Sequence, residues 1–116
     1  MIGTTMKPQA NVITISQIDI AQTQARARVN RFLLSEVGSQ FAAGEAELER
    51  VTNNWKIPIL LVTPGFVAGQ VGEVYVSWQT HEITSHTAIE QIYAEAETLK
   101  KRHDAEIQAA FLQTRN

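Results

Sequence analysis

Hydrophobic residues along this chain recur at steps of three and four between positions 20 and 37. This spacing places them on one face of a helix, because an α-helix turns by about 100° per residue. Neither Gly nor Pro interrupts the stretch, and Gly38 follows where a left-handed C-cap is needed. We predict a helix here, capped at its start by Ser16 or Asp19, with an apolar face made of Ala21, Ala25, Val29, Phe32, Leu33 and Val37.

Alternation with a period of two begins after Asn53-Asn54, a pair that suits a hairpin turn. The stretch 55–63 predicts a strand, with one face made of Trp55, Ile57, Ile59 and Leu61. Beyond Pro58 the residues on both faces of the strand are apolar, so we expect other parts of the protein to cover both faces there. Pro58 has no N–H to donate, so we expect its nitrogen at a sheet edge or at a bulge.

The segments on either side of this strand contain glycine and are interpreted as connections, at 39–47 and at 63–72. A second strand is predicted over 73–80, with one face made of Val74, Val76 and Trp78. Two strands that are adjacent in the chain and joined by a short loop are expected to pair antiparallel.

A long amphipathic helix is predicted at the C-terminal end, capped by Ser85 or by Thr87, whose stretch 87–90 matches a capping box. Its apolar side comprises Ile89, Ile92, Tyr93, Ala96, Leu99, Ile107, Ala110 and Phe111. A single helix of about 25 residues is longer than a core of this size needs. We therefore expect the excess to bind a partner, first of all a second copy of the chain. The candidate interface residues are Leu99, His103, Ile107 and Phe111.

These elements predict an α+β fold, in which a long helix packs on a two- to three-stranded antiparallel sheet and a long C-terminal helix follows. Residues 1–18 are interpreted as an N-terminal arm, and residues 19–84 as the core of helix and antiparallel hairpin. Residues 85–116 are interpreted as the C-terminal amphipathic helix.

The order of residue types in the stretches 55–59, 72–76 and 80–83 is similar to that in a known protein module. With Val74-Tyr75-Val76 and Glu82-Ile83, the chain resembles the second half of a PepSY-type module, in which a helix precedes an antiparallel hairpin. Ser77 and His81 stand where that family has an aspartate and a glycine. The resemblance covers about residues 19–84, and it implies a role in binding and in restraining peptidases, without catalysis.

Composition narrows the function classes further. The chain has 116 residues, of which 44% are hydrophobic and 19% charged, as expected for one folded domain. The absence of Cys excludes a disulfide scaffold, a thiolate zinc site and a cysteine nucleophile. A net charge of −2 argues against general nucleic-acid binding. No basic leader and no long apolar run is present, so we expect a cytoplasmic protein without membrane contact. The sequence has no G-x-x-x-x-G-K-[ST] or G-x-G-x-x-G motif, and we expect no cofactor.

Several polar groups invite a chemical interpretation. His81-Glu82 with His86 suggests a metal site, but these histidines are five positions apart, whereas the helical zinc motif needs four. The carboxylates at 45, 47 and 49 lack the apolar neighbours of a general acid. Arg26, Arg28 and Arg31 spread over more than one helix face, so we do not expect a tight phosphate cradle; a solvated face is favoured.

Trp55 and Trp78 have two interpretations. Both lie on the expected inner face of neighbouring strands, where aromatic residues anchor a core. The alternative is that they face a ligand and stack on it. We favour the core interpretation.

Together these patterns predict a non-enzymatic binding or interaction module, a homodimer through its C-terminal helix. The alternative is a small regulatory partner, antitoxin-like or inhibitor-like, whose C-terminal helix covers another protein. A third hypothesis, a small enzyme, needs His81, Glu82 and His86 to converge in one pocket.

Overall fold

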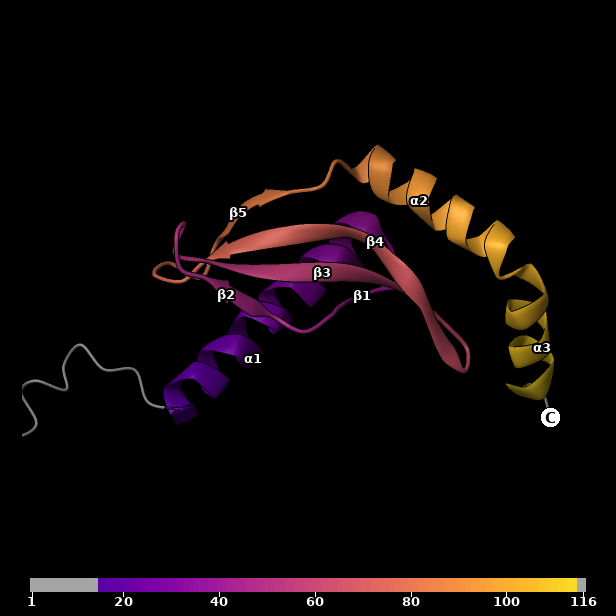
Figure 1. The fold of residues 1–116 in the computed structure, drawn as a ribbon, viewed down its shortest axis with the longest axis horizontal. Helices are drawn as coiled ribbons and strands as arrows, with labels where there is room; N and C mark the ends of the chain where they lie inside the picture. The colour runs from indigo at the N-terminus through magenta and orange to yellow at the C-terminus, as the bar shows by residue number, and fades with distance from the viewer. Residues whose placement is uncertain (1–14, 115–116) are drawn as a thin grey trace, which may run out of the picture.

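The computed structural model describes residues 15–114. A long helix lies against one face of a curled, five-stranded antiparallel sheet, and two further helices follow at the far end (Figure 1). The predicted α+β class is confirmed, but the sheet has five strands, not two or three. The elements are α1 (Ile15–Phe32), η2 (Leu33–Val37), β1 (Phe41–Ala43), β2 (Glu47–Glu49), β3 (Asn54–Thr63), β4 (Phe66–Ser77), β5 (Ile83–His86), α2 (Ile89–Arg102) and α3 (Asp104–Thr114).

Helix α1 and the wider π-helical turn η2 form the predicted first helix. Its apolar face is buried as expected: Ala21, Ala25, Val29, Leu33 and Val37 belong to the core, and Phe32 packs against it. The helix already includes Ile15, so the prediction that Ser16 or Asp19 caps it is wrong, and so is the boundary of the arm at residue 18. Residues 1–14 of the arm lie outside the described residues. Gly38 follows the last helical residue, but at φ +155° and ψ +161° it does not have the left-handed conformation predicted for the cap. Its positive φ still favours glycine, and its N–H donates to the Leu33 carbonyl at 2.7 Å.

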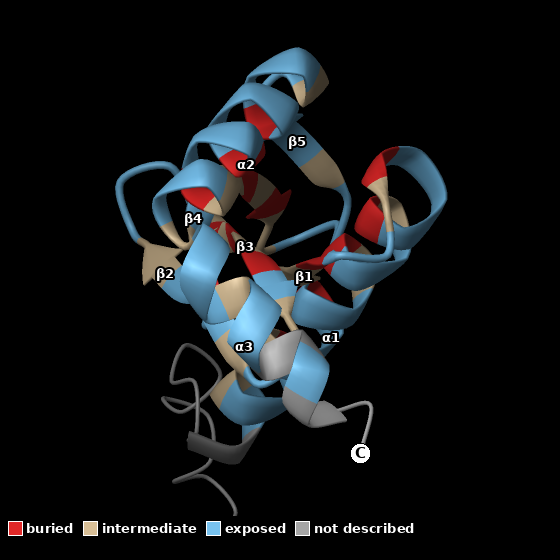
Figure 2. Ribbon diagram, turned by 90° about the vertical axis from the view of Figure 1, so that its right-hand side faces the viewer, coloured by how far each residue is buried: buried red, intermediate tan, exposed pale blue. Residues whose placement is uncertain are grey.

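The sheet has the order β1-β3-β4-β5, and β2 pairs with β3 beyond the end of β1. The alternation predicted for β3 is confirmed, because Trp55, Ile57, Ile59 and Leu61 are buried. Figure 2 shows buried residues gathered between α1, the sheet and α2. On the opposite face Leu60 is half-buried and Val62 is exposed, so the predicted cover on both sides is wrong. This second face is the open face of the sheet.

Pro58 accounts for the division of one sheet edge into two short strands. Its carbonyl accepts from the Gly44 N–H at 2.8 Å, so the backbone of Pro58 faces the segment between β1 and β2. Since proline offers no N–H on that side, the ladder breaks there, as predicted for a sheet edge or a bulge. The break also explains why β1 was missed within the predicted connection 39–47. Side chains of α1 bind the free backbone: Asn30 Oδ1 accepts from the Ala43 N–H, and Gln22 donates to the Ala46 carbonyl, both at 2.8 Å.

Strand β4 follows β3 after a tight turn at Pro64-Gly65, so the predicted loop 63–72 is wrong and so are the bounds of the strand predicted over 73–80. Gly69 and Gly72 of that segment lie within β4 and make room for α2. A Cβ atom on Gly69, where φ is +154°, would lie 3.1 Å from Leu99 Cδ1. A Cβ atom on Gly72 would lie 2.9 Å from Thr87 Cβ. Glycine at these two positions therefore lets α2 and the segment before it approach the strand closely.

The C-terminal region differs from the prediction in three ways. Residues 83–86 form β5. Thr87 Oγ1 accepts from the Glu73 N–H at 2.9 Å, so the Thr87 side chain binds the backbone of β4 and does not cap the helix. Ala88 precedes α2 without a side-chain cap, and the predicted capping by Ser85 or Thr87 is wrong. The single long helix is also wrong, because the chain bends at His103 (φ −108°, ψ 21°) between α2 and α3.

Candidate functional site

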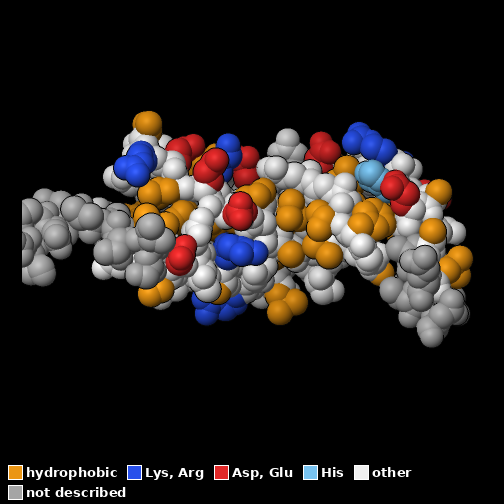
Figure 3. Space-filling model, turned by 60° about the horizontal axis from the view of Figure 1, so that its bottom comes forward, with side chains coloured by type: hydrophobic (Ala, Val, Ile, Leu, Met, Phe, Trp, Pro, Cys, Tyr) orange, Lys and Arg blue, Asp and Glu red, His pale blue; other side chains and the backbone are white. Residues whose placement is uncertain are grey.

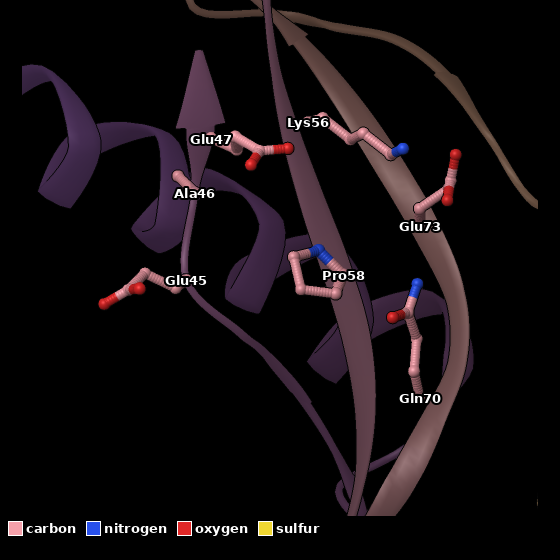
Figure 4. Close-up of a pocket in the computed structure, with 7 residues that line it drawn as sticks. All are labelled: Glu45, Ala46, Glu47, Lys56, Pro58, Gln70 and Glu73. Carbon is pink, nitrogen blue, oxygen red and sulfur yellow. The ribbon is translucent and has the colours of Figure 1, made fainter. Parts of the chain in front are cut away.

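A polar hollow of about 360 Å³ lies on the open face of the sheet (Figure 4). The ring of Pro58 lies between the acidic side chains on the β2 side and the side chains of β4. Lys56 extends from β3 towards Glu73. The lining residues are Glu45, Ala46, Glu47, Lys56, Pro58, Gln70 and Glu73. This hollow is open to solvent and predominantly polar, so we interpret it as a solvated surface.

Tyr75 lies on the same open face, and its hydroxyl donates to Glu73 Oε2 at 2.6 Å. This hydrogen bond raises the pKa of Tyr75 from 10.0 to about 12, with smaller contributions from partial burial and from the negative charges of Glu73 and Glu49. The phenol is held in its neutral form because ionisation would remove the donated proton and place a phenolate beside a carboxylate.

We expect Glu73→Gln to lower the pKa of Tyr75 towards the ordinary value of about 10. The amide removes the negative charge, and its carbonyl is a weaker acceptor for the phenol than a carboxylate. Titration of the phenolate absorbance, with Tyr75→Phe to assign the signal, measures the change. Tyr93, whose hydroxyl donates to the Val37 carbonyl at 2.6 Å, serves as the internal reference, because it lies away from Glu73. An unchanged pKa of Tyr75 in the Glu73→Gln variant would contradict this assignment.

A second hollow, of about 330 Å³, lies at the opposite end of the sheet and is predominantly apolar. It separates α3 from the turn that joins β3 to β4. We call it the C-terminal notch; its lining residues are Gln40, Leu61, Val62, Thr63, Pro64, Lys100, Asp104 and Ile107. In Figure 1, α3 descends beside the tip of the β3–β4 hairpin.

His103 stands at the bend that places α3 beside the notch. Its Nδ1 atom is 2.6 Å from Glu106 Oε1, and its ring centroid is 6.1 Å from that of Phe66, near the hairpin tip. Ile107 is half-buried on the side of α3 that faces the notch. These contacts attach the first turn of α3 to the hairpin.

Beyond that turn, apolar side chains face solvent on both sides of the notch. Leu112 of α3 is 58% exposed, and on the hairpin Val62 is 39% and Val67 is 54% exposed. Figure 3 shows hydrophobic side chains gathered towards the end of the molecule that carries α3. An apolar surface of this kind is typical of an interaction site.

Comparison of the chain with models of protein families, with curated proteins and with solved structures finds no match. The PepSY resemblance therefore stays a prediction. None of the helices in the described range 15–114 combines the length and the apolar character needed to cross a membrane.

The candidate interface residues fall into three groups. Leu99 is buried against Gly69 of its own chain, so it belongs to the packing of α2 and is not an exposed contact. His103 lies at the bend and Ile107 lines the notch, and their role in an interface stays a prediction. The side chain of Phe111 lies outside the described residues.

The two tryptophans lie side by side at the other end of the sheet, with ring centroids 5.8 Å apart. Trp55 is 1% exposed and Trp78 is half-buried against the core. The indole N–H of Trp55 has no hydrogen-bond partner among the described residues. This burial favours the interpretation of Trp55 as a core anchor over that of a ligand-facing aromatic residue.

The two histidines considered for a metal site lie in different surroundings. His81 is exposed in the turn between β4 and β5, whereas the ring of His86 packs on Phe32 with centroids 4.8 Å apart. Glu82 faces Arg28 of α1, at 3.5 Å. Within residues 15–114, no three His, Asp or Glu side chains gather closely enough to hold a metal ion.

Sequence reasoning missed the hairpin side of the notch. Val62 and Val67 flank the Pro64-Gly65 turn, and both are apolar residues next to a reversal of the chain. Loops run over the surface, so two apolar residues beside such a turn were a signal for an exposed apolar tip. Gly65 and Gly69 are typical of loops, so the sequence favours a simple loop for this segment instead.

Proposed function

We propose that the protein is a non-enzymatic binding module that forms a homodimer through its C-terminal arm, defined here as α3 together with the β3–β4 turn. The observation that carries the proposal is the C-terminal notch, an apolar hollow open beside a helix that exposes further apolar surface. The non-enzymatic part rests on the sequence, which has no Cys, no nucleophile elbow and no phosphate-binding loop.

The composition of α3 supports a buried role for more than one of its faces. After Glu106 the helix has no charged residue as far as Thr114. Ile107 and Leu112 are five residues apart, so they point about 140° away from each other around the helix. One of them faces the notch of its own chain, while the other is exposed. A helix with apolar residues on several faces is stable in water when a partner covers the second face.

A second copy of the chain fits this requirement. In a two-fold dimer, the exposed face of each α3 would pack against the hairpin tip of the other copy, where Val62 and Val67 are exposed. Such a contact is reciprocal, so the apolar surfaces of both arms are covered at once. No charged residue of α3 beyond Glu106 would have to be desolvated.

We expect Leu112→Glu to convert the dimer into a monomer, because it places a carboxylate in the centre of the proposed interface. Ala94→Glu is the matched control: it adds the same charge at an exposed helical position of α2, away from the arm. Sedimentation equilibrium over a micromolar to millimolar range measures the oligomeric state of each variant. Far-UV circular dichroism and thermal unfolding establish that both variants remain folded.

Two results would contradict the proposal. One is a wild-type chain that stays monomeric over the whole range of concentration. The other is a Leu112→Glu variant that dimerises as tightly as Ala94→Glu. A monomeric wild type would favour the alternative, in which the C-terminal helix covers a different protein.

A further inference from the structure

We propose that a cleft between α1 and the β4–β5 turn binds the phosphate group of a small phosphate monoester. The cleft is a hollow of about 440 Å³, within the range of small-molecule sites. We call it the basic cleft; its lining residues are Gln24, Ala27, Arg28, Arg31, His81 and Glu82. It lies apart from the C-terminal arm, so the inference is independent of the proposed dimer.

Helical geometry separates the arginines of α1 into two sets. Gln24, Arg28 and Arg31 follow the spacing i, i+4 and i+7, which puts them on one face. Arg26 points about 160° away from Arg28, and it donates to the Ala43 carbonyl at 3.5 Å. The prediction that the three arginines do not share a face is confirmed, yet two of them converge on the turn after β4.

The turn that closes the cleft is held by its own hydrogen bonds. Ser77 Oγ accepts from the N–H groups of Gln79 and Thr80 at 3.2 and 3.1 Å, and the Ser77 carbonyl accepts from the His81 N–H at 2.9 Å. His81 occupies the left-handed region at a φ of +62°. His81 and Glu82 of this turn line the cleft together with Arg28 and Arg31 of α1.

The charges around the cleft are unbalanced. Arg28 has one carboxylate nearby, Glu82, at 3.5 Å, and that carboxylate is 69% exposed. Arg31 has no ion pair within residues 15–114. The acidic residues of the first helix are Asp19 in α1 and Glu36 in η2, and neither forms an ion pair with Arg28 or Arg31 among the described residues. Two guanidinium groups and the single carboxylate of Glu82 leave the lining of the cleft with a net positive charge, which favours an anionic ligand.

A phosphate monoester fits these walls better than a carboxylate does. Phosphate presents three oxygen atoms, enough for both guanidinium groups and the imidazole, and arginine binds such oxygens in a bidentate manner. The organic group of the monoester would contact Ala27, an apolar residue that lines the cleft. A separate, smaller hollow of about 250 Å³ shares Gln24 with the cleft and is also lined by Asp19, Ile20 and Thr23.

The test is calorimetric titration of the full chain with phenyl phosphate and with inorganic phosphate, at constant ionic strength. Arg31→Gln and Arg28→Gln are each expected to weaken phenyl phosphate binding about tenfold or more, as the loss of a charged hydrogen bond implies. Arg26→Gln is the matched control, with the same change of charge on the same helix, and is expected to stay within about twofold. Glu82→Gln removes the competing carboxylate and is expected to tighten binding severalfold.

Three outcomes would overturn the proposal. The first is a wild-type chain that does not bind phenyl phosphate at millimolar concentration. The second is an equal loss of affinity in Arg26→Gln and Arg31→Gln, which would indicate general electrostatic attraction. The third is equal affinity for inorganic phosphate and phenyl phosphate, which would contradict the monoester and assign free phosphate. His81→Gly, which keeps the positive φ and removes the imidazole, is expected to lose affinity while the fold is retained.

Discussion

Replacing Trp55 with alanine is expected to lower the free energy of unfolding by about 3–5 kcal/mol. Trp55 is the largest of the fully buried side chains, and its ring lies 5.8 Å from that of Trp78, which directly follows β4. Its removal loses the transfer free energy of the indole and leaves a cavity between α1 and the sheet, which relaxes only in part. Urea unfolding followed by far-UV circular dichroism measures the change without relying on tryptophan fluorescence.

Two further variants compare the packing of Trp55 with the role of its indole N–H and with the packing of Trp78. Trp55→Phe is expected to cost less than Trp55→Ala, because the ring fills much of the space and the indole N–H has no hydrogen-bond partner among the described residues. Trp78→Ala is expected to cost less as well, since Trp78 is only half-buried. A soluble Trp55→Ala variant with the stability of the wild type would contradict the role of Trp55 as a core anchor.

Replacing Ile92 with alanine is expected to lower the free energy of unfolding by about 2–5 kcal/mol. Ile92 is completely buried and is the first of the three buried residues with which α2 packs on the sheet. A Cβ atom on Gly72 would lie 3.3 Å from Ile92 Cγ1, so little room is available for other side chains to fill the cavity. The same urea unfolding experiment measures the loss.

Gln91→Ala is the matched control for this position, because Gln91 is the exposed neighbour of Ile92 in the same helical turn. We expect its effect to stay within about 0.5 kcal/mol. Equal stabilities of the two variants would mean that α2 does not depend on Ile92 for its attachment to β4.

The elements that the sequence predicted well are those that bury a long, regular pattern. The stripe of α1 and the alternation from Trp55 to Leu61 each present one face to the same core, so a period of four or of two was enough to find them. The elements that were missed are short. β1 and β5 have three and four residues, too few for a period to be recognised, and they exist because longer strands offer them a ladder.

The C-terminal helix illustrates a second limit. The apolar stripe from Ile92 to Ile107 continues past His103 with neither Gly nor Pro, so the sequence gives no sign of a bend. The bend comes from tertiary contacts, in which His103 meets Phe66 and Ile107 turns to the notch. The sequence pattern also does not distinguish Leu99, which packs within its own chain, from the apolar residues that a partner could contact.

The basic cleft was beyond sequence analysis for a related reason. Helical spacing alone put Arg28 and Arg31 on one face, but nothing in the chain indicated that the turn carrying His81 would stand opposite them. That juxtaposition depends on β5 folding back beside β4, and β5 was not predicted.

Pro58 also affects whether copies of this protein can associate by adding strands to the sheet. An intact edge strand offers a row of free N–H and C=O groups that a neighbouring molecule can extend, which is the route to fibrils and to swapped sheets. Here the edge is divided into β1 and β2 opposite Pro58, and polar side chains of α1 occupy the Ala43 N–H and the Ala46 carbonyl on either side of the gap. These two backbone groups are therefore not free to pair with an added strand at this edge, which opposes growth of the sheet there.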